Sequence, residues 1–305
     1  MSNEFDVVVA GGGIAGLAAA LSAARLGRKT LVLTGDVLGG NLLSIERIEG
    51  YPGFPEGVPG YDLCPMAQGQ AAEAGAEFVS TSVQRLEGQS PGFRLATGEG
   101  EISARSVIIA TGSSIKTLGV PGEERFKGKG VSHCASCDGP MLRDAVVVVV
   151  GGGDSAMQES LTLAQNASRV LLIHRGEALR GQAAFRQRVE QDPKIEVRYR
   201  SVVTEIVGDN AVSGVRLRSG SAIESLEAAA VFVYVGLAPN TGFLEGRLHL
   251  DGSGRIATDA QMMTGQAGVF AAGSVRSGWP GRAVASAGEG AAAAIAADRY
   301  LSIHE

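Results

Sequence analysis

The N-terminal part of the chain shows an apolar run, a glycine-rich turn and an alanine-rich segment in succession. Residues 5–10 predict a buried strand, and residues 17–26 predict a helix that Gly27 ends. The turn between them, residues 11–16, reads Gly-Gly-Gly-Ile-Ala-Gly, and a second strand is expected over residues 30–33. In units of this kind, glycines permit a tight turn and bring the helix N-terminus against a pyrophosphate. The pattern therefore predicts a dinucleotide-binding βαβ unit.

The same pattern returns later in the chain, in register with the first copy. A strand over residues 145–150 runs into a second glycine-rich turn and a helix, and a further strand is expected over residues 169–173. Gly11 corresponds to Gly151, 140 positions later, and the second strands keep the same offset. Chance glycine-rich turns would not reproduce the spacing from strand to strand, so the repeat predicts two dinucleotide sites.

The two copies differ just after their second strands, where the nucleotide is selected. The first copy continues with Thr34-Gly35-Asp36, which places an acid about 20 residues beyond the fingerprint, as expected for a ribose contact. The second copy continues with His174-Arg175 and later Arg180. Arginines at this place suit the 2′-phosphate of NADP. The alternative, that they are solvated surface charges, stays open.

The remaining segments indicate how the domains are arranged along the chain. A strand over residues 107–112 closes the first region, and a turn over residues 236–241 marks a second crossover. A buried strand over residues 268–273 and an alanine-rich helix over about residues 283–301 follow. The sequence thus predicts an α/β fold with two Rossmann-like dinucleotide-binding domains, the second inserted into the first. The expected domains are residues 1–115 with 243–305, and residues 116–242.

Composition argues against several classes of partner. Lys and Arg total 27 against 32 Asp and Glu, so the formal net charge is −5 and no field of positive charge is available for a nucleic-acid backbone. Apolar runs such as residues 145–150 reach at most eight residues anywhere in the chain, far short of the roughly 20 that a membrane span needs. Residues 1–6 lack the character of a signal peptide. We therefore expect a cytoplasmic protein with neither nucleic acid nor a membrane as a partner.

Three cysteines occur, and two of them lie close together as Cys134-Ala-Ser-Cys137, followed by Asp138. In a reducing compartment such a pair is more often catalytic or metal-binding than structural. Zinc, with His133 as a further ligand, is the minor alternative, because no second cysteine pair or His pair lies nearby. Redox chemistry is favoured, since two thiols at this spacing can close a disulfide that a thiolate opens, and Asp138 can carry the proton. Cys64 stands alone and is interpreted as an inert thiol.

At these motifs the chain resembles the low-molecular-weight thioredoxin reductases, FAD proteins that pass electrons from NADPH to a C-x-x-C pair. The resemblance extends over nearly the whole chain, and the cysteine motif between two nucleotide motifs is highly specific. It implies FAD on the first domain, NADPH on the second, a homodimer, and a thioredoxin-like dithiol protein as the substrate. The segments that carry it are the two glycine-rich turns, Gly39-Gly40, Tyr51-Pro52-Gly53, Ala110-Thr111-Gly112, Cys134 to Gly139, Pro239-Asn240-Thr241 and residues 268–273.

The resemblance also implies which residues form the sites, none of them a metal site. Cys134 and Cys137 would be the redox-active disulfide, with Cys137 against the flavin and Asp138 as acid and base; the spacing leaves open which cysteine attacks the partner. The residues expected to hold FAD are Gly11, Gly13, Ile14, Ala15, Gly16, Thr34, Gly35, Asp36, Gly39, Gly40, Asn41, Val83, Ala110, Thr111, Gly112, Gly273, Ser274, Arg282 and Ala283. The residues expected to hold NADPH are Gly151, Gly153, Asp154, Ser155, His174, Arg175 and Arg180.

Several positions depart from the family pattern. Asn41 stands where the family has Gln, Ser274 where it has Asp, and Gly176 where the NADPH signature has its middle arginine. Trp279 falls in the loop expected beside the flavin, where it either covers the ring face that nicotinamide approaches or packs on the domain surface. Arg282 would place a positive charge near the flavin.

Three alternatives to an NADPH-dependent reductase stay open. The first keeps the fold and takes electrons from another donor such as ferredoxin. The second is a flavin dithiol oxidase that hands electrons to oxygen. The third is a flavin-holding protein without enzymatic activity.

Overall fold

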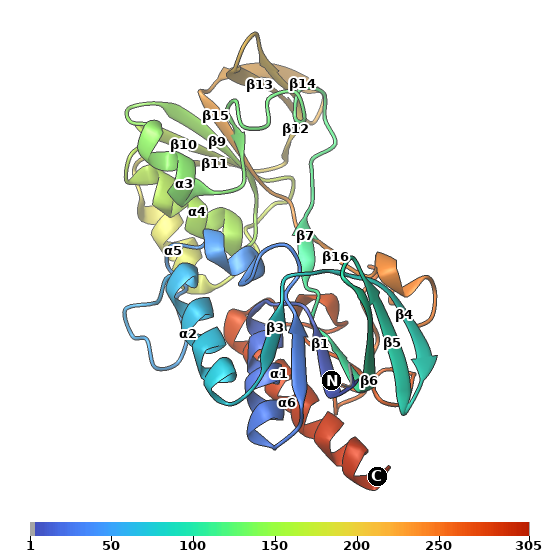
Figure 1. The fold of residues 1–305 in the computed structure, drawn as a ribbon. Coiled ribbons are helices and arrows are strands. Elements are labelled where there is room, and N and C mark those ends of the chain that lie inside the picture. Colours follow the sequence, from blue (N-terminus) through green and yellow to red (C-terminus); the bar gives the residue numbers. More distant parts are fainter. Residues whose placement is uncertain (1–3, 305) are drawn as a thin grey trace. The chain divides into compact units, whose positions relative to one another are not determined.

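The structure is a computed structural model that describes residues 4–304 and divides into two compact units (Figure 1). Unit 1 contains the residues up to Ser114 and those from Ala238 onward, and unit 2 contains Ile115–Leu237. The predicted fold class, with one α/β unit inserted into another, is confirmed. The chain leaves unit 2 in β16 (Leu237–Pro239), which pairs with β7 (Ser113–Ile115). Expectations that rest on residues 1–3 and 305, including part of the segment used to judge a signal peptide, lie outside the described residues.

Unit 1 is built on a sheet with the strand order β3-β2-β1-β6-β5-β4, in which β17 also pairs with β6. The first half of β6 pairs with β5 in antiparallel fashion, with Ala104 opposite Phe93, and its second half pairs with β17 in parallel, with Val107 opposite Val269. Strand β6 thus belongs both to the antiparallel meander of β4, β5 and β6 and to the parallel part of the sheet. The strands are β1 (Glu4–Ala10), β2 (Thr30–Leu33), β3 (Glu77–Val79), β4 (Val83–Gln89), β5 (Gly92–Thr97), β6 (Gly100–Ile109) and β17 (Val269–Ala271).

The parallel strands of unit 1 are buried on both faces, and their side chains alternate between two cores. Val9 and Ile108 face the core under the helices, whereas their neighbours Val8 and Ile109 face the opposite core, which the meander completes. The helical face is covered by α1 (Ile14–Arg25), α2 (Gly60–Glu73) and α6 (Ala283–Ile303). Short 3₁₀ helices are η1 (Gly40–Ser44), η3 (Gly242–Leu244) and η4 (Gly273–Val275).

Small residues let α1 and α6 lie side by side against this sheet (Figure 1). The buried positions of α6 follow a spacing of three and four residues and include Gly290 and Ala293. A Cβ on Gly290 would lie 2.0 Å from the carbonyl oxygen of Ala15 in α1, a distance that no real contact allows. The two helix backbones therefore touch at Gly290.

Unit 2 contains a five-stranded sheet in the order β11-β10-β9-β15-β8, with every pairing parallel. One face carries α3, α4 and α5, and the other packs on an antiparallel sheet of β12, β13 and β14. The strands are β8 (Val131–Ser132), β9 (Val146–Gly151), β10 (Arg169–Ile173), β11 (Ile195–Arg198), β12 (Ser201–Gly208), β13 (Val212–Ser219), β14 (Ala222–Glu227) and β15 (Ala230–Tyr234). The helices are α3 (Ala135–Asp138), η2 (Gly139–Met141), α4 (Asp154–Ala164) and α5 (Ala183–Gln191).

The sequence repeat is a structural repeat. Helix α1 begins at Ile14 and α4 at Asp154, and β2 and β10 end at Leu33 and Ile173, so both pairs keep the predicted offset. The glycine before each helix, Gly13 or Gly153, is extended and caps it. Each unit therefore presents the N-terminus of a helix at the carboxyl end of a buried parallel strand, as predicted.

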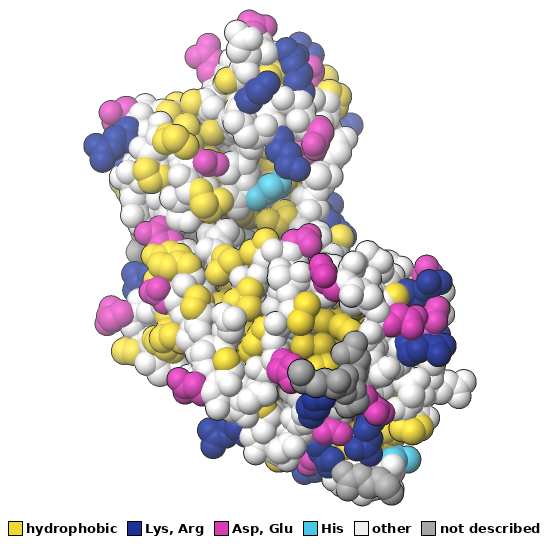
Figure 2. All heavy atoms as spheres, viewed as in Figure 1, with side chains coloured by type: hydrophobic (Ala, Val, Ile, Leu, Met, Phe, Trp, Pro, Cys, Tyr) yellow, Lys and Arg dark blue, Asp and Glu magenta, His cyan; other side chains and the backbone are white. Residues whose placement is uncertain are grey.

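The surface carries charges of both signs. On the face drawn in Figure 2, Lys and Arg side chains are interspersed with Asp and Glu, in line with the formal net charge of −5. Of the helices within residues 4–304, none combines the length and apolar character that crossing a membrane needs.

The contact between α1 and α6 can be tested with a pair of glycine variants. Gly290→Ala should lower the free energy of unfolding by about 1–3 kcal/mol, because its Cβ meets backbone atoms of Ala15 that cannot rotate away. Gly288→Ala on the same helix is the matched control: nothing lies within 4 Å of its Cβ, and alanine should stabilise the helix there by about 0.5–1 kcal/mol. Urea unfolding of the full chain measures both. Equal stability of the two variants would contradict the close contact.

Candidate active site

The first glycine-rich turn of unit 1 contains glycines of two kinds. Gly11 has a φ of +121°, and a Cβ there would lie 2.2 Å from the Ala110 carbonyl oxygen. A Cβ on Gly16 would lie 1.9 Å from the Gly11 carbonyl oxygen, so both positions are closed by the chain itself. At Gly13, by contrast, nothing lies within 4 Å of a Cβ position. Open space therefore remains at the N-terminus of α1, where backbone N–H groups point outward.

The segments after β2 lie beside this turn. Thr34 is buried with its hydroxyl bonded to the Gly35 carbonyl at 3.0 Å, whereas Asp36 is exposed. Gly39 donates its N–H to Gly12 at 2.8 Å, which brings residues 39–41 next to the glycine-rich turn. The predicted residue Val83 starts β4 and packs on the core of the meander.

A chain of hydrogen bonds connects three further segments of unit 1. The Asn41 amide donates to the Ser113 carbonyl at 2.6 Å, and the Ser113 hydroxyl donates to the Ser274 carbonyl at 3.0 Å. A Cβ on Gly112 would lie 3.7 Å from the Ser274 hydroxyl. The structure thus brings the predicted residues Asn41, Ser274 and Gly112 together. Ser113, which joins them, was missed by the sequence analysis because its role depends on partners far away in the chain.

A buried ion pair, also missed from the sequence, holds the turn that carries Ser274. The Glu289 carboxylate on α6 accepts the Gly273 N–H at 2.8 Å and pairs with the Arg276 guanidinium at 2.5 Å. Both side chains are at least 85% buried, at 15% and 10% exposure. The ion pair therefore ties η4 to α6. The available signal was an acid flanked by small residues, Gly288 and Gly290, in an alanine-rich helix.

Trp279 contacts the first turn of α6. Its indole N–H donates to the Ser286 hydroxyl at 2.8 Å, and that hydroxyl lies 3.2 Å from the carbonyl of Arg282, the residue that caps the helix. Ala283, the first residue of α6, packs in the same apolar cluster as Ile14, the first residue of α1. The starts of the two helices therefore lie together.

In unit 2 the second glycine-rich turn is held by the segment near residue 180. Arg180 donates its N–H to the Gly152 carbonyl at 2.7 Å, and Asp154 accepts the Gln182 N–H at 2.7 Å. Gly153 is open, since the one atom within 4 Å of its Cβ position is the Arg180 carbonyl oxygen at 3.9 Å. Ser155, which follows in α4, is exposed. The opening at the helix N-terminus is thus repeated in unit 2.

His174 lies beneath the second glycine-rich turn. A Cβ on Gly152 would lie 2.1 Å from its ring, which is 8% exposed, and its Nε2 has no hydrogen-bond partner among the described residues. Arg175 and Arg180 are exposed. The predicted basic residues are therefore free to meet a ligand, while His174 supports the turn from below.

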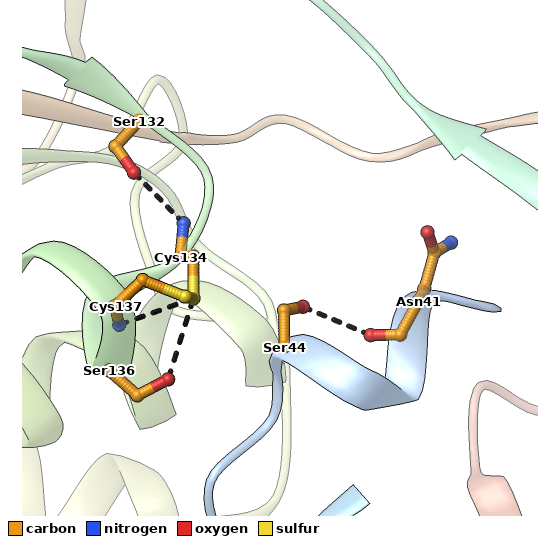
Figure 3. Close-up of a disulfide and its surroundings, with 6 residues drawn as sticks. All are labelled: Asn41, Ser44, Ser132, Cys134, Ser136 and Cys137. Atoms are coloured by element: carbon orange, nitrogen blue, oxygen red, sulfur yellow. Dashed lines mark hydrogen bonds between the residues drawn. A yellow bond between two sulfur atoms is a disulfide. The ribbon is translucent and has the colours of Figure 1, made fainter. Parts of the chain in front are cut away.

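Cys134 and Cys137 form a disulfide at the start of α3, with an S–S distance of 2.09 Å (Figure 3). The Cys134 sulfur accepts the Cys137 N–H at 3.3 Å, and the Ser136 hydroxyl lies 3.5 Å from the same sulfur. The Cys134 N–H donates to the Ser132 hydroxyl at 3.1 Å. Cys137 is exposed and Cys134 is half-buried. The disulfide that the resemblance implies is therefore present, with Cys137 the more accessible cysteine.

Tyr234, at the end of β15, lies close to α3. Burial raises the pKa of its phenol, and the negative charges of Glu159 and Asp138 raise this pKa further. Its hydroxyl is buried, so the group stays a neutral phenol near the disulfide. Tyr234 could not be recognised from the sequence, because nothing local shows that β15 ends beside the C-x-x-C segment.

His133 is anchored to the end of β15 by one hydrogen bond. Its Nδ1 lies 2.9 Å from the Val233 carbonyl, and because a carbonyl only accepts, Nδ1 is the donor. Within residues 4–304, no group of three or more His, Cys, Asp or Glu side chains is arranged to hold a metal ion.

Comparisons with known proteins agree on one family. Residues 5–290 match the model of the pyridine nucleotide-disulphide oxidoreductases. The chain is 39% identical to the thioredoxin reductase of Treponema pallidum over 303 residues, which cover 99% of this chain and 98% of the relative.

Solved structures of the same kind are similar over almost the whole chain. The thioredoxin reductase of Lactococcus lactis is 35% identical, with 98% of this chain and 99% of that chain covered and a TM-score of 0.94. A ferredoxin-flavin thioredoxin reductase of Clostridium acetobutylicum is 29% identical, with 98% and 99% covered and a TM-score of 0.54.

The third cysteine gives a prediction for thiol labelling. Cys64 is fully buried in α2, and burial raises the pKa of its thiol to about 11. Because the thiolate is the reactive form, iodoacetamide at about pH 8 should label Cys134 and Cys137 in the reduced native protein and leave Cys64 unlabelled. Cys64 should react when the protein is unfolded, where its pKa falls back toward about 8.5. Peptide mass spectrometry measures each site, and rapid labelling of Cys64 in the native protein would contradict its burial.

Proposed function

Because the chain belongs to the pyridine nucleotide-disulphide oxidoreductase family, we propose that it passes electrons from NADPH, through FAD and the Cys134–Cys137 pair, to the disulfide of a thioredoxin-like protein. The observation that carries this proposal is the presence, in one chain, of two registered dinucleotide folds and a C-x-x-C disulfide. Two nucleotide sites and a dithiol are the parts that transfer of electrons from a nicotinamide to a disulfide requires.

Unit 1 suits FAD. The open position at Gly13 leaves the N–H groups at the start of α1 free for a pyrophosphate, and residues 39–41, 110–112 and 273–274 lie beside that turn or beside one another. We assign FAD to the whole set of unit 1 residues named from the sequence. When bound, FAD supplies a carrier of two electrons between nicotinamide and disulfide.

The Arg276–Glu289 ion pair positions part of this site. It joins η4, which carries Ser274, to α6, and it accepts the Gly273 N–H at 2.8 Å as well. A buried pair of this kind holds one geometry, since breaking it would leave an uncompensated charge. Its role is to fix the turn that we assign to the flavin.

Unit 2 suits NADPH. Gly153 and Ser155 leave the N-terminus of α4 open to a pyrophosphate, and the exposed guanidinium groups of Arg175 and Arg180 are available to a 2′-phosphate. Two further residues support these segments. The His174 ring packs under Gly152, and the Asp154 carboxylate accepts the N–H of Gln182.

The disulfide chemistry is assigned to α3. Two electrons break the S–S bond of Cys134 and Cys137 and, with one proton, leave a thiol and a thiolate. The thiolate attacks the partner's disulfide, and the second cysteine then closes the S–S bond again, so that the partner leaves as a dithiol. We assign Cys137 to the flavin and Asp138, the next residue in α3, to proton delivery to the leaving sulfur.

A ferredoxin-dependent enzyme is the second candidate. It is supported by the likeness to the ferredoxin-flavin enzyme of Clostridium acetobutylicum and by Gly176, which replaces one arginine of the NADPH signature. In a ferredoxin-dependent enzyme, the second glycine-rich turn would be part of the fold and would bind no NADPH.

We further propose a homodimer that works in the cytoplasm. The dimer is supported by the family resemblance. The cytoplasm is supported by the use of cysteine, because a reactive pair with one further, buried thiol suits a reducing compartment.

The FAD assignment can be tested at Gly13. Gly13→Ala should leave the fold intact, because nothing lies within 4 Å of its Cβ, and should weaken FAD binding by about tenfold or more, because the methyl group occupies the place of the pyrophosphate. Gly69→Ala, an equally open position in α2, is the matched control. FAD per protein after dialysis measures the effect, and equal retention by both variants would refute the assignment.

The donor can be tested by anaerobic addition of NADPH to the FAD-loaded protein. The visible absorbance of the flavin should bleach promptly, and the protein should then reduce thioredoxin. Cys134→Ser and Cys137→Ser should keep the bleaching and lose disulfide reduction by at least about a thousandfold, since neither can form the redox disulfide. Cys64→Ala is the matched control and should keep both activities.

Two outcomes would contradict this mechanism. Unimpaired disulfide reduction by either serine variant would remove the pair from the reaction. No bleaching with NADPH, together with bleaching by reduced ferredoxin, would replace the donor and favour the second candidate.

A further inference from the structure

Arg200 lies next to the segment that follows β10, although it is far from that segment in the sequence. It stands in the two-residue turn between β11 and β12, with a φ of +52°. Its N–H donates to the Gly176 carbonyl at 3.0 Å, and the next residue, Ser201, donates to the His174 carbonyl at 3.1 Å. The two loops are therefore held side by side at the carboxyl edge of the sheet.

The side chain of Arg200 reaches the same segment. Its guanidinium lies 3.0 Å from the Glu177 carboxylate, and the two side chains are 73% and 77% exposed. An ion pair this exposed contributes little to stability, so a ligand can displace Glu177 at small cost. Arg198, two residues earlier, contrasts with it, because that guanidinium is held by both Glu196 and Glu224.

The backbone gives no reason for an arginine at this position. A positive φ favours Gly or Asn over a long side chain, so Arg200 occupies a conformation that costs energy. Gly176, whose carbonyl it contacts, is the place where the family signature has its middle arginine. The charge missing from one loop is therefore present on the neighbouring loop.

We propose that Arg200 takes the place of the missing arginine and, with Arg175, binds the 2′-phosphate of the nucleotide in unit 2. The proposal rests on the NADPH site proposed above. A phosphate monoester carries nearly two negative charges and accepts paired N–H donors, which a guanidinium supplies in a planar fork. In the absence of ligand, Glu177 is the counter-ion of Arg200, and the phosphate replaces it.

This assignment makes Arg200 a specificity residue. A nucleotide without the 2′-phosphate offers it no anion, so the ion pair with Glu177 stays in place and the residue contributes nothing to binding. A nucleotide with the 2′-phosphate is bound by the Arg200 guanidinium. Discrimination between NADPH and NADH is therefore expected to depend on Arg200.

The test uses 2′,5′-ADP and 5′-ADP, which differ by the 2′-phosphate, and measures their binding to the full FAD-saturated chain by isothermal titration calorimetry. Arg200→Asn, chosen because Asn accepts a positive φ, should weaken 2′,5′-ADP by about tenfold and leave 5′-ADP unchanged. Glu177→Gln should tighten 2′,5′-ADP by about threefold, because a competing charge is removed. Arg216→Asn is the matched control, since Arg216 is an exposed, ion-paired arginine elsewhere in the same unit.

The outcomes separate the two proposals. Tight binding of 2′,5′-ADP to the unaltered protein with no loss in Arg200→Asn would overturn the role of Arg200 and leave the NADPH site standing. An equal loss for both nucleotides, or the same loss in Arg216→Asn, would also overturn it. Failure of the unaltered protein to bind either nucleotide would overturn the NADPH site itself, and Arg200's role with it.

Discussion

Direct contact between backbones, at positions where no side chain has room, is the constraint on which unit 1 depends. Gly16 lies against the Gly11 carbonyl, and Gly290 lies against the Ala15 carbonyl. These contacts draw the first turn of α1 onto the end of β1 and draw α6 onto α1. Between these close contacts, Gly13 is open, since nothing lies within 4 Å of its Cβ position. A nucleotide-binding turn of this kind therefore depends on positions without a side chain as well as on the side chains around it.

The two copies of the fold use the same backbone with different supports. Gly12, the middle glycine of the first turn, lies against Thr34, a small side chain that follows β2, whereas its counterpart Gly152 in unit 2 lies against the ring of His174. The offset of the repeat is unchanged, although the side chains of the two turns and of the residues that follow the second strands differ. In folds of this kind, the residues that follow the second strand are the ones that select the nucleotide.

The features that could be predicted from the sequence are those whose signal is local. The glycine-rich turns, the repeat and the C-x-x-C pair each depend on residues a few positions apart, and the fold class followed from their order. The contacts between Asn41 and Ser113, between Arg276 and Glu289, and between Glu177 and Arg200 join segments separated by many residues. No periodicity marks such pairs in one sequence, because they exist only once the sheets bring the loops together.

The shared strand β6 has a consequence for the order in which the chain can become structured during synthesis. Unit 2 is continuous, so all of its strands are available once Leu237 has been made. Unit 1 is not, because β17 and α6, which complete its sheet and cover its helical core, come last. Until they are made, the second half of one edge of β6 has no partner strand and the small-residue face of α1 is not covered. The inserted unit 2 can therefore fold on the ribosome before unit 1, which flanks it in the sequence. Unit 1 is completed only when α6 packs on its helical core.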